Sequence, residues 1–551
     1  MNNAPAVSYS YRNSALADGA FPFAKMSSYN LSLYAQDKYQ VSDNFKLTYG
    51  IRADYTYFPT KLDPNPNLAA LTFQNGLQVD ISKFPNKKLL FSPRVGFNYD
   101  VFGNKTTQLR GGTGIFTGQV PYVWISNQAS NTGTLFSSST VSTVGDPRLI
   151  FNPNVNANRP APGTVNANTS YEVDATSKDF KYPQIWRTNV AVDQKLPMGI
   201  IATIEASYTK DINAVNFSNA ALPNNSTGLI TLPGIEGQQR YTVKSTQTGT
   251  TAANPSISPF IYMQNTKKGY SYFITGQLQK SFLNGFNASA AYTYSQSRSV
   301  NDGGSTASSI WSQRAIAGDA NSDVLANTNF IQPNRVIASL SYKREYFKHA
   351  ATTIGLIFES ANNGAFSYVS SGDINNDGGA NDLLYIPQNQ GDITLVPDFV
   401  GDTRTSAQIW NQLNAYISQD SYLSKHRGEF AKRNGAIMSY FKRADLHIAQ
   451  DFFVGPKGKR NTLQFTLDII NLGNMLNSDW GLYQTPNIPL STYNTAVLLA
   501  YKGLDAVSGK PTYSFPYQDK ANLTPYTTTY KNITDQISRW QAQFGVRYIF
   551  N

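Results

Sequence analysis

Hydrophobic and polar residues alternate with a period of two along much of this chain of 551 residues. From position 45 to position 57 the odd positions are Phe, Leu, Tyr, Ile, Ala, Tyr and Tyr, and the even positions between them are Lys, Thr, Gly, Arg, Asp and Thr. Because successive side chains of a β-strand point to opposite faces, this pattern predicts a strand with one apolar and one polar face. The same alternation predicts thirteen strands, at residues 27–41, 44–58, 90–101, 106–117, 184–196, 199–216, 268–282, 284–299, 334–346, 349–361, 443–453, 462–474 and 537–550.

The predicted strands are long enough for a membrane, since most run to about 10–15 residues and about 9–11 tilted residues cross a bilayer. Tight turns are expected at residues 42–43, 103–104, 197–199, 284–285 and 455–458. Long stretches rich in Asn, Ser, Thr, Gly and Pro separate the strand pairs, at residues 59–89, 118–183, 217–267, 300–333, 362–442 and 475–536. Short turns on one side and long loops on the other are typical of an outer-membrane β-barrel. A soluble β-sandwich would have shorter strands, and a solenoid would show a fixed repeat.

The number of predicted strands is odd, whereas single-chain bacterial barrels normally have an even number. The first predicted strand runs into a short turn, so the segment before it is expected to belong to an outside loop. A further hairpin near Val497–Tyr501 would leave the parity unchanged. The fold class expected is therefore all-β, an antiparallel transmembrane β-barrel of which residues 1–551 form a part that begins inside the barrel.

Composition narrows the possible functions. Hydrophobic residues make up 40% of the chain without any apolar run of about 18 residues, which excludes a membrane protein built from helices. Aromatic residues reach 13% and charged residues only 15%, against about 25% charged in ordinary soluble domains. Tyr and Trp on outward faces suit the bilayer interface. On the strands, Ile51 and Phe544 are expected to face lipid, and Arg52, Asp54 and Arg547 the lumen.

Catalytic and nucleic-acid functions have little support in the sequence. The chain has no Cys and only three His, so thiolate chemistry is excluded and a histidine metal site is disfavoured. The net charge of +11 is scattered, without a basic run, so nucleic acid is not an expected partner. His349 is expected at a hairpin turn, His426 after a loop helix and His447 on a polar strand face. We therefore expect no enzyme.

Residues 405–423 carry Ile409, Leu413, Tyr416, Ile417 and Tyr422 at helical spacing. An amphipathic helix is therefore predicted inside a long external loop. Its apolar face is expected to pack against the barrel mouth, and a ligand-binding lid is the alternative.

Residues 373–382 carry the clearest chemical motif. Oxygen-bearing side chains at alternate positions of a tight loop can converge on Ca²⁺, and a glycine permits the sharp bend. Leu384 stands where an EF-hand loop has its bidentate Glu, so the predicted site is a weak one. The alternative is a turn rich in Asx hydrogen bonds that holds no ion. The candidate calcium ligands are Asp373, Asn375, Asp377, Gly379, Asn381 and Asp382.

Several segments resemble TonB-dependent outer-membrane receptors. They are NLSLYAQDKY at 30–39, SPRVGF at 92–97, LRGGTG at 109–114 and the last strand, FGVRYIFN at 544–551, which departs from the usual pattern by ending on Asn551 rather than on an aromatic residue. Three further stretches resemble the Oar-like branch of that family: GDINNDGGAND at 372–382 with YIP at 385–387, HRGE at 426–429 with RNG at 433–435, and DIINLGN at 468–474 with NSDW at 477–480.

The resemblance implies a barrel of about 22 strands, closed by an N-terminal plug. It also implies a periplasmic TonB box that couples proton-motive force to uptake, and a small carboxypeptidase-regulatory-like domain further upstream. Residues 1–551 would then be the C-terminal part of the barrel, with thirteen of its strands. No plug, TonB box or signal peptide is recognised in this sequence.

Pattern and resemblance together predict a receptor in the outer membrane of a Gram-negative bacterium, which takes up a large or peptide-like ligand through long external loops. Its expected partners are outer-membrane lipid and lipopolysaccharide, the TonB complex through the missing N-terminal part, and an extracellular ligand. One alternative is a passive porin or structural barrel, which would lack a plug. Another is a surface protease at the barrel rim, which would need an acidic and histidine cluster there.

Overall fold

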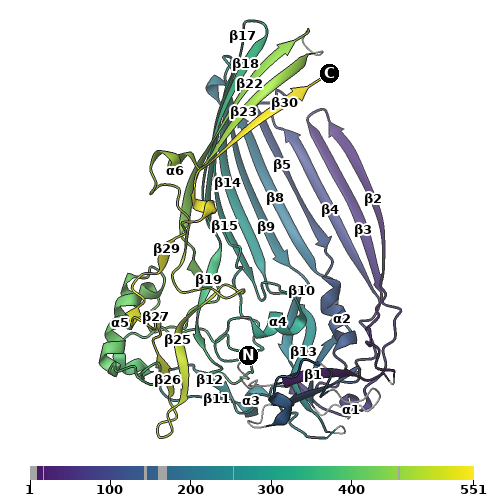
Figure 1. The fold of residues 1–551 in the computed structure, drawn as a ribbon. Helices are drawn as coiled ribbons and strands as arrows, with labels where there is room; N and C mark the ends of the chain where they lie inside the picture. The colour runs from purple at the N-terminus through teal and green to yellow at the C-terminus, as the bar shows by residue number, and fades with distance from the viewer. Residues whose placement is uncertain are drawn as a thin grey trace.

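The computed structural model describes residues 9–16, 18–141, 146–154, 156–158, 170–251, 254–456 and 460–550. Within these residues, thirteen antiparallel strands form one continuous wall in which each strand lies beside its neighbours in the sequence (Figure 1). The predicted number of wall strands is confirmed. In order they are β2 (Tyr29–Ser42), β3 (Phe45–Tyr57), β4 (Lys88–Asp100), β5 (Thr107–Thr117), β8 (Gln184–Lys195), β9 (Ile201–Asp211), β14 (Tyr270–Ser281), β15 (Phe286–Ser299), β17 (Asn334–Tyr346), β18 (Ala350–Asn362), β22 (Tyr440–Val454), β23 (Asn461–Ile470) and β30 (Gln541–Ile549), with the short β16 (Ala326–Asn327) beside β15.

Three predicted strands extend four residues or more beyond the observed ones at one end. The strand predicted at 199–216 ends at Asp211, and the chain continues as β10 (Ala214–Asn219), which leaves the wall. Alternation shows only that two faces of a strand differ, so it cannot tell which sheet the strand joins. The strand predicted at 462–474 ends earlier, because α6 (Leu472–Leu476) follows β23. The strand predicted at 537–550 begins later, because the 3₁₀ turn η6 (Gln536–Ser538) precedes β30.

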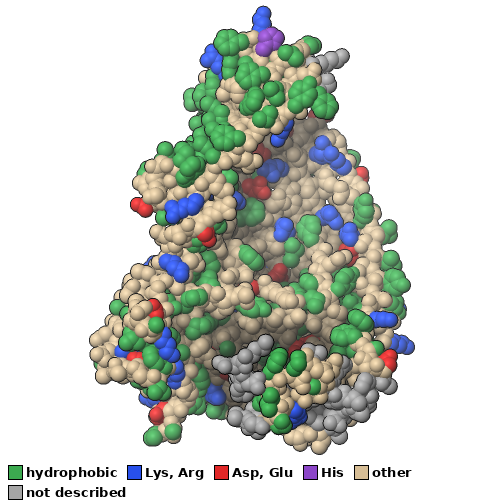
Figure 2. Space-filling model, in the orientation of Figure 1, with side chains coloured by type: hydrophobic (Ala, Val, Ile, Leu, Met, Phe, Trp, Pro, Cys, Tyr) green, Lys and Arg blue, Asp and Glu red, His purple; other side chains and the backbone are tan. Residues whose placement is uncertain are grey.

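The two faces of the wall differ in chemistry. Figure 2 shows a hollow whose lining carries Lys, Arg, Asp and Glu side chains, with hydrophobic side chains along its outer margins. On the polar face Arg110 of β5 lies 3.1 Å from both Asp193 of β8 and Glu205 of β9, the next two strands of the wall. On the opposite face Ile51 is 48% exposed and Phe544 is 78% exposed. An apolar face left uncovered along many strands is the arrangement of a lipid-facing barrel wall.

The two ends of the wall differ in their connections. At one end the strands meet in tight turns, where Met198, Gly285 and Phe347 have φ values of 62°, 90° and 54°. Part of the turn expected at 455–458 lies outside the described residues. At the other end the long connections fold into separate structures, among which β1 (Tyr9–Ser14) pairs with β6 (Phe136–Val141). The segment before the first wall strand therefore belongs to the loop side, as expected.

The long connections build two lobes, each with its own hydrophobic core. The N-terminal lobe contains a three-stranded sheet and short helices, and its core includes Phe217, Phe260 and Trp311. The C-terminal lobe contains a five-stranded sheet and one longer helix, and its core includes Tyr368 and Phe515. The elements of the N-terminal lobe are α1 (Pro66–Ala69), α2 (Tyr122–Ser130), α3 (Asn225–Gly228), α4 (Ala307–Ser312), β7 (Ser170–Thr176), β10 and β13 (Ser256–Thr266); those of the C-terminal lobe are α5 (Ser406–Gln419), β19 (Ala365–Ser371), β20 (Thr394–Leu395), β21 (Ala436–Ile437), β25 (Thr495–Leu504) and β26 (Pro511–Ser514).

The hairpin expected near Val497–Tyr501 is present as β25 and β26, and it lies outside the wall. Smaller strand pairs complete the loops: β11 (Leu229–Thr231) with β12 (Gln239–Tyr241), β24 (Gln484–Pro486) with β29 (Tyr530–Asn532), and β27 (Tyr517–Asp519) with β28 (Thr524–Pro525). Every described helix is too short or too polar to cross a bilayer.

Helix α5 confirms the amphipathic helix predicted at 405–423, although it ends at Gln419. Its N-terminus is closed by a capping box in which Thr405 and Gln408 each accept a hydrogen bond from the other's backbone N–H. Its predicted apolar face lies in the core of the C-terminal lobe, with Ile409, Leu413, Tyr416 and Ile417 all buried. Tyr422 follows the helix and packs against the same core. The apolar face therefore packs, but against other loop residues in the C-terminal lobe rather than against the barrel mouth as expected.

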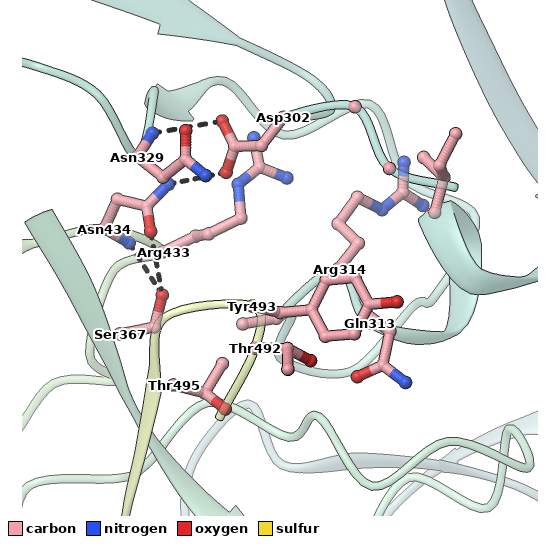
Figure 3. Close-up of a pocket in the computed structure, with 14 residues that line it drawn as sticks. Asp302, Gln313, Arg314, Asn329, Ser367, Arg433, Asn434, Thr492, Tyr493 and Thr495 are labelled. Atoms are coloured by element: carbon pink, nitrogen blue, oxygen red, sulfur yellow. Dashed lines mark hydrogen bonds between the residues drawn. The ribbon is translucent and has the colours of Figure 1, made fainter. Parts of the chain in front are cut away.

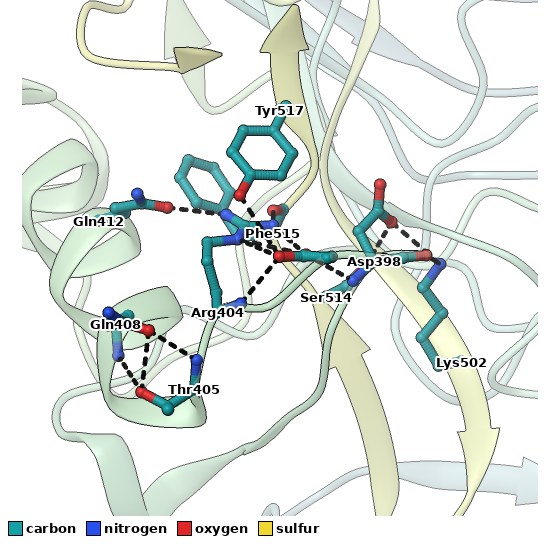
Figure 4. Close-up of polar contacts among 10 residues, drawn as sticks. Asp398, Arg404, Thr405, Gln408, Gln412, Lys502, Ser514, Phe515 and Tyr517 are labelled. Atoms are coloured by element: carbon teal, nitrogen blue, oxygen red, sulfur yellow. Dashed lines mark hydrogen bonds and ion pairs between the residues drawn. The ribbon is translucent and has the colours of Figure 1, made fainter. Parts of the chain in front are cut away.

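The buried Arg404 links the start of this helix to Phe515, the residue after β26 (Figure 4). Arg404 Nη2 lies 2.7 Å from Asp402 Oδ2, and the two side chains are 7% and 0% exposed. The same guanidinium donates to the carbonyl oxygen of Phe515 at 2.9 Å and lies 3.8 Å from the ring centre of Tyr517. The positive charge of Arg404 is thus paired with a carboxylate, and its N–H groups donate hydrogen bonds to nearby oxygens.

The lipid-facing assignment predicts an asymmetric effect of charge on β3. Ile51→Arg in the full-length protein should destabilise the inserted barrel by about 2–4 kcal/mol, because a cation near the bilayer midplane has no water. Thr48→Arg on the polar face of the same strand is the control and should cost far less. Urea titration in lipid vesicles, followed by heat-modifiable migration on gels, measures both. Equal losses would contradict the assignment.

Candidate functional site

The predicted acidic turn follows β19 and lies where the two loop lobes meet. Tyr241 of the N-terminal lobe donates its backbone N–H to the carbonyl oxygen of Asn375 at 2.7 Å, and Ile316 donates to that of Asn381 at 3.1 Å. Within the turn, Asn376 and Gly378 have φ values of 57° and 95°, a region open to Asn and Gly. The motif residues thus fold one tight turn at the junction.

The carboxylates of this turn accept hydrogen bonds from its own backbone. Asp373 Oδ1 accepts from the N–H of Asp377 at 2.9 Å, and Asp377 Oδ1 accepts from that of Gly379 at 2.6 Å. Asp382 Oδ2 accepts from the N–H of Ile374 at 2.8 Å. Such Asx contacts stabilise a turn without any ion.

The structure brings the six predicted calcium ligands into this one turn. Asp373 is partly exposed and forms an ion pair of 2.7 Å with Lys244, and the other five are buried. Burial raises the pKa of the Asp377 carboxyl, and it raises the pKa of Asp382 further, with Asp377 adding repulsion. Asn381 Oδ1 is buried and has no hydrogen-bond partner. Buried negative charge and an unpartnered oxygen both suit a cation.

One property of the turn does not suit a cation as it stands. Within the described residues, no group of three or more His, Asp or Glu side chains has an arrangement that could hold a metal ion. The carboxylates would have to give up amide contacts to converge on calcium. Leu384 is fully buried in the core of the C-terminal lobe, which agrees with its failure to supply a ligand. Calcium at this turn stays a prediction.

A polar cavity of about 150 Å³ lies beside the turn (Figure 3). Two arginines line it, Arg314 after α4 and Arg433 before β21, and they are 5% and 6% exposed. Asn381 of the acidic turn donates its side-chain amide to the carbonyl oxygen of Arg314, so the turn and the cavity share a wall. Burial, together with the like charge of Arg433, lowers the pKa of Arg314 to about 10. Asp302 is the one carboxylate among the residues that line the cavity.

Sequence reasoning did not find this pair of arginines. Arg433 belongs to the RNG stretch at 433–435 that resembles Oar-like proteins, but Arg314 stands in no motif. The two come together only because the loop after β15 packs against the segment before β21: Arg433 donates to the backbone oxygens of Ser299 and Val300.

The three histidines lie on separate elements. His349 Nδ1 lies 3.1 Å from the carbonyl oxygen of Phe453 at the turn end of the wall, as expected for a hairpin residue. His426 follows α5 and the 3₁₀ turn at Leu423–Lys425. His447, on the polar face of β22, lies 2.6 Å from Asp468 of β23. Each lies in the kind of position the sequence predicted.

A match to a protein-family model agrees with the architecture. A family model described as an outer membrane beta barrel domain matches residues 8–495. No curated protein matches the chain. Similar solved structures include the siderophore receptor PirA from Acinetobacter baumannii, with 9% identity and a TM-score of 0.38 over 82% of this chain and 42% of that chain. The FrpB iron transporter from Neisseria meningitidis has 10% identity and a TM-score of 0.38, over 83% of this chain and 43% of that chain. A variant of the ferric enterobactin receptor PfeA from Pseudomonas aeruginosa has 9% identity and a TM-score of 0.36, over 81% of this chain and 40% of that chain.

The chain spans 40 to 43% of the length of these three receptors. The family match covers most of the chain, including all the wall strands from β2 to β23. The wall has the apolar outer face and the division into short turns and long loops that such a domain requires. The chain therefore belongs to the family of outer-membrane β-barrel domains, and it resides in the outer membrane of a Gram-negative bacterium.

Proposed function

We propose that the chain is the C-terminal barrel part of a TonB-coupled receptor of the Oar-like branch, which takes up a large or peptide-like ligand captured by its external loops. The observation that supports this most is the contrast between the two ends of the wall. Among the described residues one end has only tight turns, while the other carries two lobes with hydrophobic cores of their own. Loops that serve only as connections do not need cores, so ordered lobes favour recognition of a partner.

The edges of the wall support the proposal that it is part of a larger closed barrel. Within the described residues, β2 pairs only with β3, and β30 only with β23. Unpaired backbone groups facing hydrocarbon cost several kcal/mol each, so both edges require partner strands in the membrane. We attribute these to the rest of a barrel of about 22 strands, and the polar hollow to contact with a plug or water.

The proposed partners follow from the three surfaces of the chain. The apolar face would contact membrane lipid and lipopolysaccharide, and the lobes an extracellular ligand. The TonB complex would act through a plug and N-terminal segment that the family resemblance implies. A passive porin or structural barrel, and a surface protease at the rim, remain the alternatives.

The orientation of the lobes can be tested with two epitope insertions in the full-length protein. An epitope placed after Val507, 97% exposed at the tip of the β25–β26 hairpin, should bind antibody on intact cells. One placed after Lys348, in the turn between β17 and β18, should bind only after the outer membrane is permeabilised. Antibody binding to the second epitope on intact cells would mean that the lobes face the periplasm.

Uptake distinguishes the proposed function from its alternatives. Cells producing the full-length protein should accumulate a radiolabelled tryptic digest of casein, and a protonophore should stop accumulation while surface binding persists. Accumulation that ignores the protonophore would indicate a passive porin. Shortened fragments in the medium would indicate a protease. A strain without the protein is the control, and no binding above that strain would refute the ligand class.

We also propose that the turn at 373–382 binds calcium weakly, with a structural role. The buried carboxylates of Asp377 and Asp382 and the free oxygen of Asn381 support this. Without a bidentate Glu, the dissociation constant expected is on the order of 10⁻⁴ to 10⁻³ M.

Calcium should therefore protect residues 370–390 of the full-length protein from protease. Asp377→Asn should abolish the protection because it removes a charged ligand. Asp505→Asn is the matched control, since Asp505 also accepts backbone N–H groups in a turn, at the exposed tip of a hairpin. The readout is the rate of cleavage within 370–390 in calcium and in chelator. If the wild-type turn is cut equally fast in both, the calcium site is refuted.

A further inference from the structure

Arg314 and Arg433 are buried guanidinium groups that form no ion pair within the described residues. Arg314 donates to the side-chain oxygens of Asn216 and Asn301, both at 3.3 Å, and to the carbonyl oxygen of Ala320. Arg433 donates only to two backbone carbonyl oxygens. The Nε atom of each is buried without an acceptor. A guanidinium has five N–H donors, so neither side chain is fully satisfied.

Arg404 in the same protein shows how this fold compensates a buried arginine when the role is structural. Its guanidinium has a carboxylate partner in Asp402, an amide oxygen in Gln412, a carbonyl oxygen and an aromatic ring. Burying a charge without a counter-ion costs several kcal/mol. Burial lowers the pKa of both guanidinium groups, although Asp319, Asp323 and Asp377 act on Arg314 and Asp302 acts on Arg433. Two buried arginines close together without a direct ion pair are a poor solution for stability alone.

The cavity between the two arginines is accessible from outside. Its rim includes Gly303, Gln313 and Thr492, which are exposed, whereas both arginines lie deeper. Figure 3 shows the two side chains on either side of an open space, above Thr492, Tyr493 and Thr495. A volume of about 150 Å³ admits a group roughly the size of a benzene ring, so it would hold one end of a ligand rather than a large molecule.

The charges of the cavity indicate the chemistry of that end. Asp302 is engaged by the side-chain amide of Asn434 at 2.6 Å and by the backbone N–H of Asn329 at 3.3 Å. Among the residues that line the cavity, the two arginines and this carboxylate leave one positive charge, while Asp319, Asp323 and Asp377 act on Arg314 from behind the lining. A monoanion balances that charge, whereas a phosphate dianion would meet repulsion from Asp302. A planar carboxylate also matches the N–H edge of a guanidinium.

We propose that this cavity binds a ligand carboxylate between Arg314 and Arg433, whose positive charges attract it. The carboxylate site adds detail to the proposed function. It rests on that function because it assumes that the external lobes capture the ligand. The hydroxyl and amide groups of the lining hold the atoms next to the carboxylate. In a peptide-like ligand the group is the C-terminal carboxylate, and in a smaller one it is that of a free organic acid.

The test uses the full-length protein in detergent and needs no cellular energy. Titration calorimetry with tetraalanine should show binding, and tetraalanine amide, which lacks the carboxylate, should bind at least tenfold more weakly. Competition by acetate identifies the source of the carboxylate: a peptide end if tetraalanine competes at much lower concentration, a free acid if the two are equal. Equal binding of acid and amide, or tighter binding of inorganic phosphate, would overturn the proposal.

Variants separate recognition from a structural role. Arg314→Gln and Arg433→Gln should each weaken tetraalanine binding at least tenfold while the Tm without ligand stays unchanged or rises, because an uncompensated buried charge is removed. Arg427→Gln is the matched control, since Arg427 also contacts only neutral oxygens of the lobe and lies outside the cavity. A lower Tm with unchanged binding would overturn the proposal. Uptake insensitive to a protonophore, with carboxylate binding intact, would refute the transport function alone.

Discussion

Pairing of backbone N–H and C=O groups between neighbouring strands is the interaction on which the rest of this structure depends. Hydrocarbon offers no water to replace a missing partner, so each strand that crosses it must be bonded on both sides. The strands from β3 to β23 meet this condition through a wall in which sequence neighbours are spatial neighbours. That order leaves every connection at one of the two ends. The tight turns and the lobes are thereby separated by the membrane.

The lobes obey a different requirement, because they lie outside the hydrocarbon and must bury apolar surface to remain ordered. Residues from distant connections supply their cores. Leu232 and Ile235, from the connection that also carries β10, pack in the same cluster as Phe515 near the end of the chain. The junction between the lobes consequently contains buried polar groups, and the acidic turn and the arginine cavity both lie there.

Charge is handled differently in the three regions of the protein. In the hollow of the wall, cations and carboxylates on adjacent strands neutralise each other, as Arg335 and Glu359 do at 2.7 Å. Within the C-terminal lobe, Arg404 and Asp402 form a closed pair. At the junction the acidic turn carries negative charge and the neighbouring cavity positive charge, without a direct ion pair between them, and Asp377 of the turn acts on Arg314. Buried charge without a direct ion pair is costly, and this accessible place is therefore where we propose ligand binding.

The sequence alone determined the wall, the helix in the loops and the candidate turn, because each depends on local order. A period of two sets the faces of β3, turn residues set its connection, and Thr405 with Gln408 sets the start of α5. Only the tertiary structure decided that β10 leaves the wall, that β19 pairs in parallel with the distant β25, and that Arg314 meets Arg433. These three outcomes depend on which apolar faces pack together across long loops. A periodic pattern shows that a strand has an apolar face, but it does not show which other segment packs against that face.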